Sequence, residues 1–315
     1  MNIKEQIMDV IQKGKISGSW LISGEYGVGK KKFASELASF LTTGKWQETY
    51  QYHPNIKWIE CGLTEDAKKE IQKMILAGKS VEENEKTTHK KQEITIDDIR
   101  AGIQFLSLKP AKNEYRILII NLAENMNRNA SNALLKVLEE PYPQSVLILL
   151  TQNTGKLLPT ICSRCRKIII PKLDFSEIAE QLNAMYPQCQ DTDLIAELSN
   201  GSIGLACDIY NQNGLELYQK LTSFLVPFAQ VDIEKLNEFA DFLSKNEKQY
   251  DLFCSLLLNR LLFYAKQYAQ LNQTKTEKII DVFDEVKKDL ELVRTLYLDK
   301  KQIIISSILS LCEVL

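Results

Sequence analysis

Residues Gly24 to Lys31 have the types and the spacing of a phosphate-binding loop. Their sequence, G-E-Y-G-V-G-K-K, fits the pattern G-x-x-x-x-G-K-[S/T] at every position except the last. The pattern requires Ser or Thr there because the hydroxyl ligates the magnesium ion that bridges two phosphates. Lys31 has no lone pair to offer when charged, so it would place a cation where the metal should lie. The residues that would still contact a phosphate are Gly24, Gly27, Gly29 and Lys30.

A second part of the same site is also altered. The apolar run from Arg116 to Ile120 predicts a buried strand that faces the loop. In a working P-loop ATPase an acid after this strand holds the magnesium shell, and a second acid orients the attacking water. Asn121 and Leu122 stand at these positions, and Glu124 comes two positions late, so we expect it to be directed elsewhere. The sequence therefore predicts the architecture of an NTPase without its hydrolysis, although the glycine loop taken alone could be a tight turn.

The segment Cys162-Ser163-Arg164-Cys165 matches C-x-x-C, which raises a redox or metal function. One such pair cannot complete a zinc site with four ligands, and the chain has two histidines in no paired motif. The pair also leads into a predicted strand instead of opening a helix, so we expect neither function. Arg164 is of greater interest because it lies where a helix gives way to a strand at the edge of the predicted sheet. A surface salt bridge is the alternative role for this arginine.

Composition places the chain among soluble globular proteins of two or three domains. It has 315 residues, 44% of them hydrophobic and 25% charged, and its apolar runs are far too short to span a membrane. No signal peptide opens the sequence, and the seven cysteines are an odd, scattered set, which indicates free thiols in a reducing, cytoplasmic location. The net charge of −2 gives no global reason to bind nucleic acid, so any DNA contact would need a local patch or other subunits.

Strands alternate with helices in the first half of the chain, which predicts a mainly parallel sheet covered on both faces. Thr95 and Asp98 have the spacing of a capping box at the start of one helix. Residues 64–93 are rich in Lys, Glu and Gln, and we expect a solvated helix and a mobile loop there in preference to a binding tail. The predicted strands are 20–23, 56–60, 116–120, 145–151 and 167–170, and the clearest helix is 129–141.

Beyond Pro171 the strand signal disappears and helical spacing dominates. We therefore predict three units: an α/β P-loop domain over residues 1–171, a small helical domain over 172–213 and a larger all-α domain over 214–315.

With its segments in this order, the chain resembles the AAA+ clamp-loader family over roughly residues 1–210. The blocks N-A-L-L-K-V-L-E-E-P at 132–141 and Ser163-Arg164-Cys165 are the most specific to that family. The other segments that carry the resemblance are 24–30, 53–55, 96–100, 123–127 and 158–162.

The resemblance implies an AAA+-type domain followed by a helical lid and a C-terminal collar that joins subunits. It implies a pentameric loader of tau/gamma, delta and stator subunits, which opens the sliding clamp and places it on primed DNA. The stator does not hydrolyse ATP. Its arginine, which corresponds to Arg164 between Ser163 and Cys165, reaches into the ATP site of the neighbouring motor subunit as an arginine finger in trans.

Three departures from the family bear on cofactors. The segment Thr42 to His53 holds no cysteine, so the zinc module common in the family is not expected and we predict no metal. Gly204 stands where motor subunits carry a nucleotide-sensing arginine. The charged stretch 64–93 has no counterpart that we can place. No cofactor is expected to be required, and weak binding of ATP or phosphate stays open.

Two other functions remain as alternatives. An ATP-hydrolysing motor subunit of the tau/gamma kind would need Ser or Thr at position 31 and acids at 121 and 122. A stand-alone nucleotide-binding regulator would be a monomer that ignores clamp-loader partners.

Overall fold

The structure, a computed structural model, describes residues 18–47, 53–61, 93–110, 114–225, 230–296 and 298–314. Nearly all of the charged stretch 64–93 lies outside these ranges. The chain divides into two compact units, Met1–Pro171 and Lys172–Leu315. This division falls at the first predicted domain boundary, while the further boundary at residues 213 and 214 stays a prediction.

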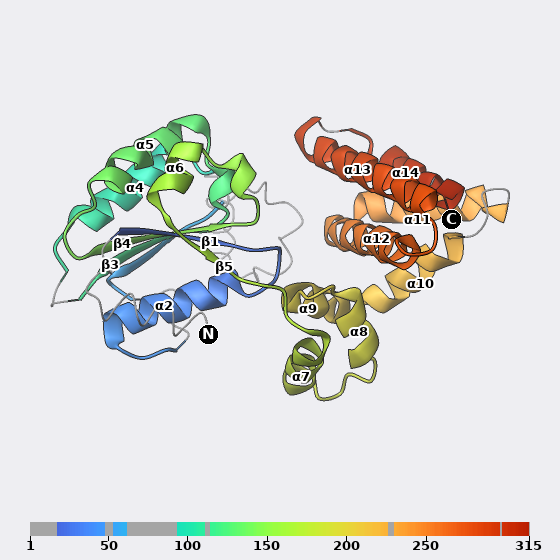
Figure 1. The fold of residues 1–315 in the computed structure, drawn as a ribbon, viewed down its shortest axis with the longest axis horizontal. Coiled ribbons are helices and arrows are strands. Elements are labelled where there is room, and N and C mark those ends of the chain that lie inside the picture. Colours follow the sequence, from blue (N-terminus) through green and yellow to red (C-terminus); the bar gives the residue numbers. More distant parts are fainter. Residues whose placement is uncertain are drawn as a thin grey trace, which may run out of the picture. The chain divides into compact units, whose positions relative to one another are not determined.

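The first unit is built on a sheet of five parallel strands in the order β2-β3-β4-β1-β5 (Figure 1). Every neighbouring pair is parallel, which confirms the predicted α/β class. The central strand β4 is buried along its whole length, as expected of a parallel strand covered on both faces. The strands are β1 (Gly18–Ser23), β2 (Ile56–Ile59), β3 (Arg116–Ile120), β4 (Ser145–Thr151) and β5 (Arg166–Ile169).

Helices cover the two faces of the sheet (Figure 1). Alternate side chains of a strand point to opposite faces, so Trp20 and Ile22 pack in the cluster formed with α2 (Lys30–Thr43). Leu21, between them, belongs to the cluster on the other face. The helices that contribute to that second cluster are α4 (Ile96–Ser107), α5 (Arg128–Glu139) and α6 (Pro159–Arg164).

Two helix starts show how the sequence sets these elements. The Asp98 carboxylate accepts hydrogen bonds from the Thr95 backbone N–H at 2.9 Å and from its hydroxyl at 2.6 Å, so the predicted capping box is confirmed. The Asn127 side chain caps α5 by accepting from the N–H of Ala130 at 2.9 Å. These caps fix the ends of helices that border the functional segments.

The second unit is helical throughout its described residues (Figure 1). One continuous hydrophobic cluster runs from Ile178 to Cys312. The helices are α7 (Phe175–Met185), α8 (Thr192–Leu198), α9 (Ile203–Asn211), α10 (Gly214–Phe224), α11 (Ile233–Lys245), α12 (Glu247–Tyr268), α13 (Gln273–Leu296) and α14 (Lys300–Val314).

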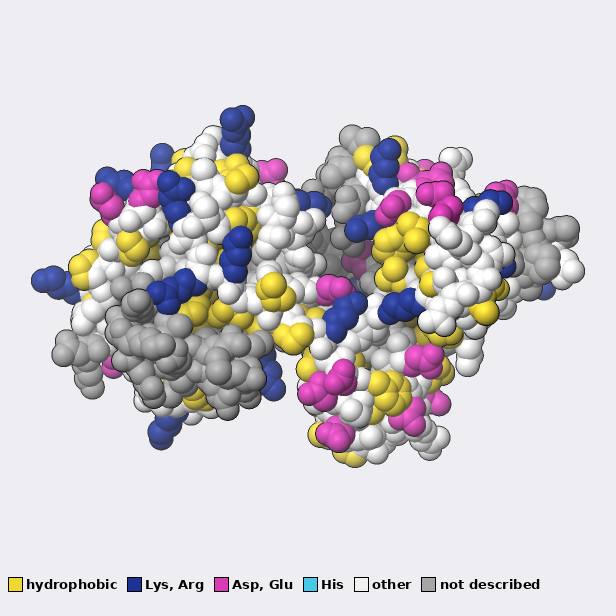
Figure 2. Space-filling model, viewed as in Figure 1, with side chains coloured by type: hydrophobic (Ala, Val, Ile, Leu, Met, Phe, Trp, Pro, Cys, Tyr) yellow, Lys and Arg dark blue, Asp and Glu magenta, His cyan; other side chains and the backbone are white. Residues whose placement is uncertain are grey.

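Charge is mixed over the face drawn in Figure 2, with acidic side chains gathered over α7 and α8 and the loop between them. This part of the second unit therefore does not present a basic surface to a phosphate backbone. No helix among the described residues combines the length and the apolar character needed to cross a bilayer. The acidic residues of this region are Asp174, Glu177, Glu180, Asp191, Asp193 and Glu197.

Candidate functional site

The glycine loop lies where the sequence predicts it, between the end of β1 at Ser23 and the start of α2 at Lys30. Gly29 caps the helix with a left-handed backbone (φ 93°), and Gly27 is also left-handed (φ 71°). A Cβ added at Gly24 would come within 2.7 Å of the Ile170 carbonyl oxygen. Glycine is thus required for two turns and for one close approach, which is the geometry of a phosphate-binding loop.

The Lys30 side chain is folded back onto the loop that carries it. Its ammonium donates to the carbonyl oxygens of Gly24 at 2.7 Å and Glu25 at 2.5 Å, and the residue is only 8% exposed. Burial lowers the pKa of this ammonium, while the carboxylates of Glu124 and Glu25 act in the opposite direction and raise it. The lysine that would bind a phosphate therefore already has partners within its own loop.

Lys31 and Asn121, which stand at the sequence positions of the magnesium ligands, share one partner, Glu60. The Lys31 ammonium lies 2.7 Å from Oε2 of Glu60, and Nδ2 of Asn121 donates to the same oxygen at 3.1 Å. Both residues that replace metal ligands thus bind one carboxylate. An ammonium and an amide N–H supply hydrogen-bond donors, whereas magnesium requires oxygen ligands, so this arrangement does not fit the metal.

The position of the second catalytic acid is occupied by Leu122, whose backbone is left-handed (φ 53°, ψ 55°). A short 3-10 turn, Ala123–Asn125, follows. The Glu124 side chain binds a backbone group after β4: its Oε1 accepts from the Gln152 N–H at 2.9 Å, and its charge also raises the pKa of Lys30. That Glu124 cannot replace the missing catalytic acid stays a prediction. Its Oε2 is buried and has no hydrogen-bond partner among the described residues.

Arg164 lies at the opposite end of the sheet from the glycine loop. It ends α6, and β5 begins two residues later with Arg166 paired to Trp20 of β1. Because β1 and β5 run parallel, Arg164 is near the amino end of β1, whereas the loop follows its carboxyl end. The 6 residues of β1 span about 20 Å at ~3.3 Å per residue. Arg164 therefore cannot serve the glycine loop of its own chain.

The Arg164 guanidinium is held by two contacts, and the side chain as a whole is 35% exposed. Nη2 lies 2.6 Å from Oε1 of Glu139, and Nη1 donates to the Thr160 carbonyl oxygen at 3.0 Å. The hydroxyl of Ser163 donates to the same carbonyl at 3.2 Å. An arginine with a fixed, partly exposed guanidinium can still offer N–H groups to an anion that arrives from outside.

Cys165 anchors the chain directly after Arg164. It belongs to the hydrophobic cluster shared by α4, α5 and α6. Burial raises the pKa of its thiol to about 12, and the neighbouring Cys162 adds to the rise. A thiol in this state is a poor nucleophile and a poor metal ligand. No group of three or more metal-binding side chains occurs in the part of the chain that the structure describes.

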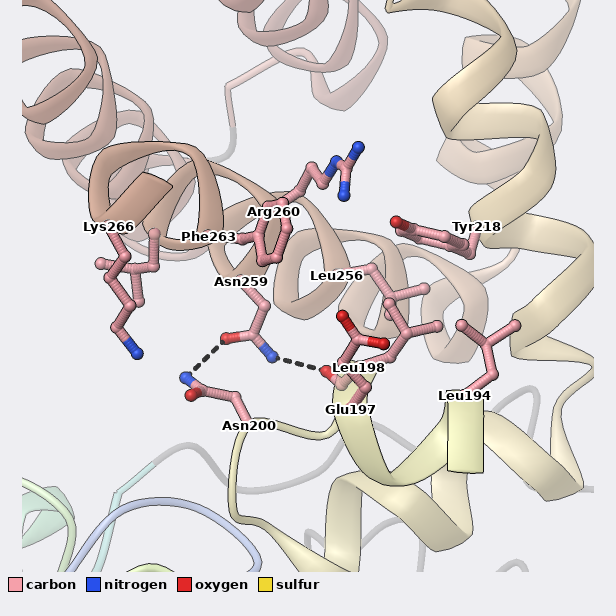
Figure 3. A pocket seen from close by; sticks show the side chains of 11 residues that line it. Leu194, Glu197, Leu198, Asn200, Tyr218, Leu256, Asn259, Arg260, Phe263 and Lys266 are labelled. Atoms are coloured by element: carbon pink, nitrogen blue, oxygen red, sulfur yellow. Dashed lines mark hydrogen bonds between the residues drawn. The ribbon is translucent and has the colours of Figure 1, made fainter. Parts of the chain in front are cut away.

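A separate pocket of about 180 Å³ lies in the second unit, between α8, α10 and α12 (Figure 3). The side chain of Asn259 spans its wall, where it accepts from Asn200 Nδ2 at 3.3 Å and donates to the Leu198 carbonyl at 3.0 Å. The Arg260 guanidinium lies 5.0 Å from the centre of the Phe263 ring. These groups are largely engaged with each other, and no sequence motif pointed to this pocket.

Sequence reasoning missed two residues that contact the predicted site. Glu60 follows β2, and Glu139 is part of the N-A-L-L-K-V-L-E-E-P block without a role assigned to it. Both are acidic residues at the ends of secondary-structure elements, and this much is visible in the sequence. Their partners could not be predicted, because they depend on the order of the strands and on the packing of α5 against α6.

The family model and the curated relatives that match this chain are DNA polymerase III subunits. A family model described as "DNA polymerase III, delta subunit" matches residues 1–174. The DNA polymerase III subunit tau of Escherichia coli is 28% identical over 205 residues, covering 63% of this chain and 29% of that protein. Subunit delta' of Bacillus subtilis is also 28% identical, over 203 residues, covering 63% of this chain and 55% of its own length.

Among solved structures, a gamma subunit-related protein of Thermotoga maritima matches with a TM-score of 0.48 and 21% identity, covering 99% of both chains. The chain spans between 29% and 55% of the two curated relatives named above.

Proposed function

The chain belongs to the DNA polymerase III delta subunit family, and from this membership we propose that it is a non-hydrolysing stator subunit of the delta-prime kind in a clamp loader. In this role it contributes no catalysis of its own. It supports a neighbouring motor subunit that hydrolyses ATP while the complex loads a sliding clamp onto primed DNA.

One observation carries the proposal: Lys31 and Asn121 both bind Glu60 where a motor subunit would hold magnesium. Without the metal, the charge that develops on a transferring phosphoryl group has no counter-ion in this loop. Lys30 is engaged with carbonyl oxygens of the loop, which further disfavours a bound triphosphate. Weak binding of ATP or phosphate through backbone N–H groups of residues 27–30 remains part of the proposal.

The active part in this proposal is Arg164, acting in trans. Its distance from the chain's own loop and its partly exposed guanidinium support a role at the nucleotide of a neighbour. An arginine finger stabilises the charge on the transferred phosphoryl group and typically accelerates hydrolysis by about 10³- to 10⁵-fold. Ser163 and Cys165 support it, the first by bonding the same carbonyl and the second by anchoring the chain.

The proposed partners are the tau/gamma and delta subunits, with the sliding clamp and primed DNA reached through the complex. The helical second unit would provide the surface that joins the subunits. A cytoplasmic location and the absence of zinc are further parts of the proposal.

A reconstituted complex tests the function. Arg164→Ala should lower clamp- and DNA-stimulated ATP hydrolysis at the site of the adjacent motor subunit by about 10³-fold without changing assembly, because it removes only the charge at that subunit's phosphate. Arg166→Ala is the control, since the Arg166 guanidinium lies over the Trp20 ring, 5.6 Å from its centre. Unchanged turnover with Arg164→Ala would exclude the finger.

The second candidate is an ATP-hydrolysing motor subunit, favoured by the intact pattern from Gly24 to Lys30 and by the similarity to the E. coli tau subunit. It predicts magnesium-dependent ATP turnover by the purified chain alone, abolished by Lys30→Ala. If the purified chain shows no such turnover, the motor-subunit candidate is wrong and the stator proposal stands.

A further inference from the structure

The contact between Arg164 and Glu139 has the geometry of a positioning interaction. Nη2 of Arg164 and Oε1 of Glu139 are 2.6 Å apart, which is the length of a charge-assisted hydrogen bond. The two residues end the helices α6 and α5, which pack against each other in one hydrophobic cluster. The carboxylate is therefore presented from a rigid element.

The second contact of Arg164 comes from its own helix. Nη1 donates to the carbonyl oxygen of Thr160, one turn earlier, at 3.0 Å. One terminal nitrogen is thus fixed from within α6 and the other from α5. A planar guanidinium held at two nitrogens has a defined orientation. It also keeps N–H groups for a ligand, because each of these nitrogens carries two hydrogens.

A free arginine side chain has many rotamers, and a finger must adopt one of them at the partner's phosphate. Fixing the rotamer before assembly removes that entropic cost from the catalytic step. We propose that Glu139 is a positioning residue, which holds the Arg164 guanidinium in the orientation that a neighbouring subunit's nucleotide requires. This inference rests on the proposed trans role of Arg164.

The adjacent residue Glu140 provides a matched control. It is also an exposed glutamate at the end of α5, but it caps the helix, and no ion pair or side-chain hydrogen bond of its carboxylate occurs among the described residues. Glu139→Gln and Glu140→Gln each remove one negative charge from the same helix end. They differ only in the loss of the ionic partner of Arg164.

The test measures ATP turnover of the reconstituted complex with clamp and primed DNA. Glu139→Gln should lower kcat roughly two- to fivefold, the size expected when one partly exposed ion pair is lost, with KM for ATP unchanged. Glu140→Gln should match the wild type. In an Arg164→Ala background, Glu139→Gln should have no further effect, because a positioning residue acts only through the arginine.

The outcomes are distinct. If Arg164→Ala lowers turnover and Glu139→Gln equals Glu140→Gln, the positioning role is wrong while the finger stands. If Glu139→Gln raises turnover, Glu139 restrains the arginine instead of presenting it, and the proposal is overturned. If Arg164→Ala itself has no effect, the proposed trans role of Arg164 is wrong, and the positioning role of Glu139 is wrong with it. The thermal unfolding midpoints of the two glutamine variants should differ by no more than about 2 °C, the shift that loss of one partly exposed ion pair produces, which separates positioning from loss of fold.

Discussion

The two ends of the five-stranded sheet each carry a basic side chain paired with a glutamate, but the surroundings of the two pairs differ. At the carboxyl end, Lys31 binds Glu60 beside a glycine loop whose own lysine, Lys30, is buried and binds loop carbonyls. At the amino end, Arg164 binds Glu139 and the Thr160 carbonyl, and its planar guanidinium keeps further N–H groups for an anion. The Lys31 side chain is the more exposed of the two, 53% against 35%, so the difference lies in the neighbours of each cation and in its chemistry.

This difference teaches that a glycine loop serves the fold as well as a ligand. The loop connects β1 to α2 and packs closely on Ile170, so it contributes to the fold whatever it binds. In the stator that we propose, the ion pair of Lys31 with Glu60 would take the place of the metal and remove the like-charge repulsion of an unoccupied acidic site. The same fold would then present Arg164 at its other end.

Among changes at the carboxyl end of the sheet, the largest effect is expected from rebuilding the metal site. The triple variant Lys31→Thr, Asn121→Asp and Leu122→Glu restores the oxygen ligands that a P-loop offers to magnesium, at 31 and 121, and the acid that orients water, at 122. Magnesium should then strengthen ATP affinity by on the order of tenfold to a hundredfold, measured by calorimetric titration with and without the metal. In the wild type we expect less than about a threefold effect.

Leu122→Glu alone is the control for this experiment. It adds an acid but leaves Lys31, Glu60 and Asn121 bonded as they are, so magnesium should have no effect on ATP binding. If the ATP affinity of the wild-type chain depends strongly on magnesium, the expectation that Lys31 and Asn121 prevent magnesium from binding is wrong.

A smaller effect is expected at the amino end of the sheet, where ionisation of the Cys165 thiol, next to Arg164, makes stability depend on pH. The pKa of Cys165 rises from 9.0 to about 12 in the folded state. Above pH 9 the unfolded chain releases a proton that the folded chain retains, so stability falls as pH rises toward 12. Relative to Cys165→Ala, the wild type should lose about 1 kcal/mol more of its unfolding free energy between pH 7.5 and pH 10.

Urea unfolding followed by tryptophan fluorescence measures this difference, because Trp20, Trp46 and Trp58 all belong to the first unit. Cys189→Ala, in the second unit, keeps the Cys165 thiol and should show the wild-type drop. Equal drops for the wild type and Cys165→Ala would mean that the thiol is not protected by burial.

The smallest effect is expected from Glu60→Gln. The side chains of Lys31 and Glu60 are 53% and 43% exposed, so loss of their ion pair should cost about 0.5 kcal/mol of unfolding free energy in the same assay. Asp97→Asn, which breaks the more exposed pair with Arg100, should cost less. If Glu60→Gln is as stable as Asp97→Asn, the ion pair of Lys31 with Glu60 does not stabilise the fold as expected.

Much of the first unit could be predicted from sequence, because buried parallel strands produce continuous apolar runs. The strands Arg116–Ile120 and Ser145–Thr151 have the predicted bounds, and the glycine loop lies between strand and helix as expected. The contact of Lys31 with Glu60 could not be predicted, since it depends on the strand order. The bond of Glu124 to the Gln152 N–H could not be predicted either, because it depends on a left-handed Leu122, on a 3-10 turn and on the neighbouring strand β4.

The comparison of Lys30→Ala with Arg164→Ala in one reconstituted complex tests the central claim most directly. Both variants remove a single cation from the first unit, at opposite ends of its sheet. The proposed stator predicts that Lys30→Ala keeps ATP turnover within about twofold of the wild type and that Arg164→Ala lowers hydrolysis at the adjacent motor subunit's site by about 10³-fold. Loss of turnover with Lys30→Ala, and normal turnover with Arg164→Ala, would contradict it.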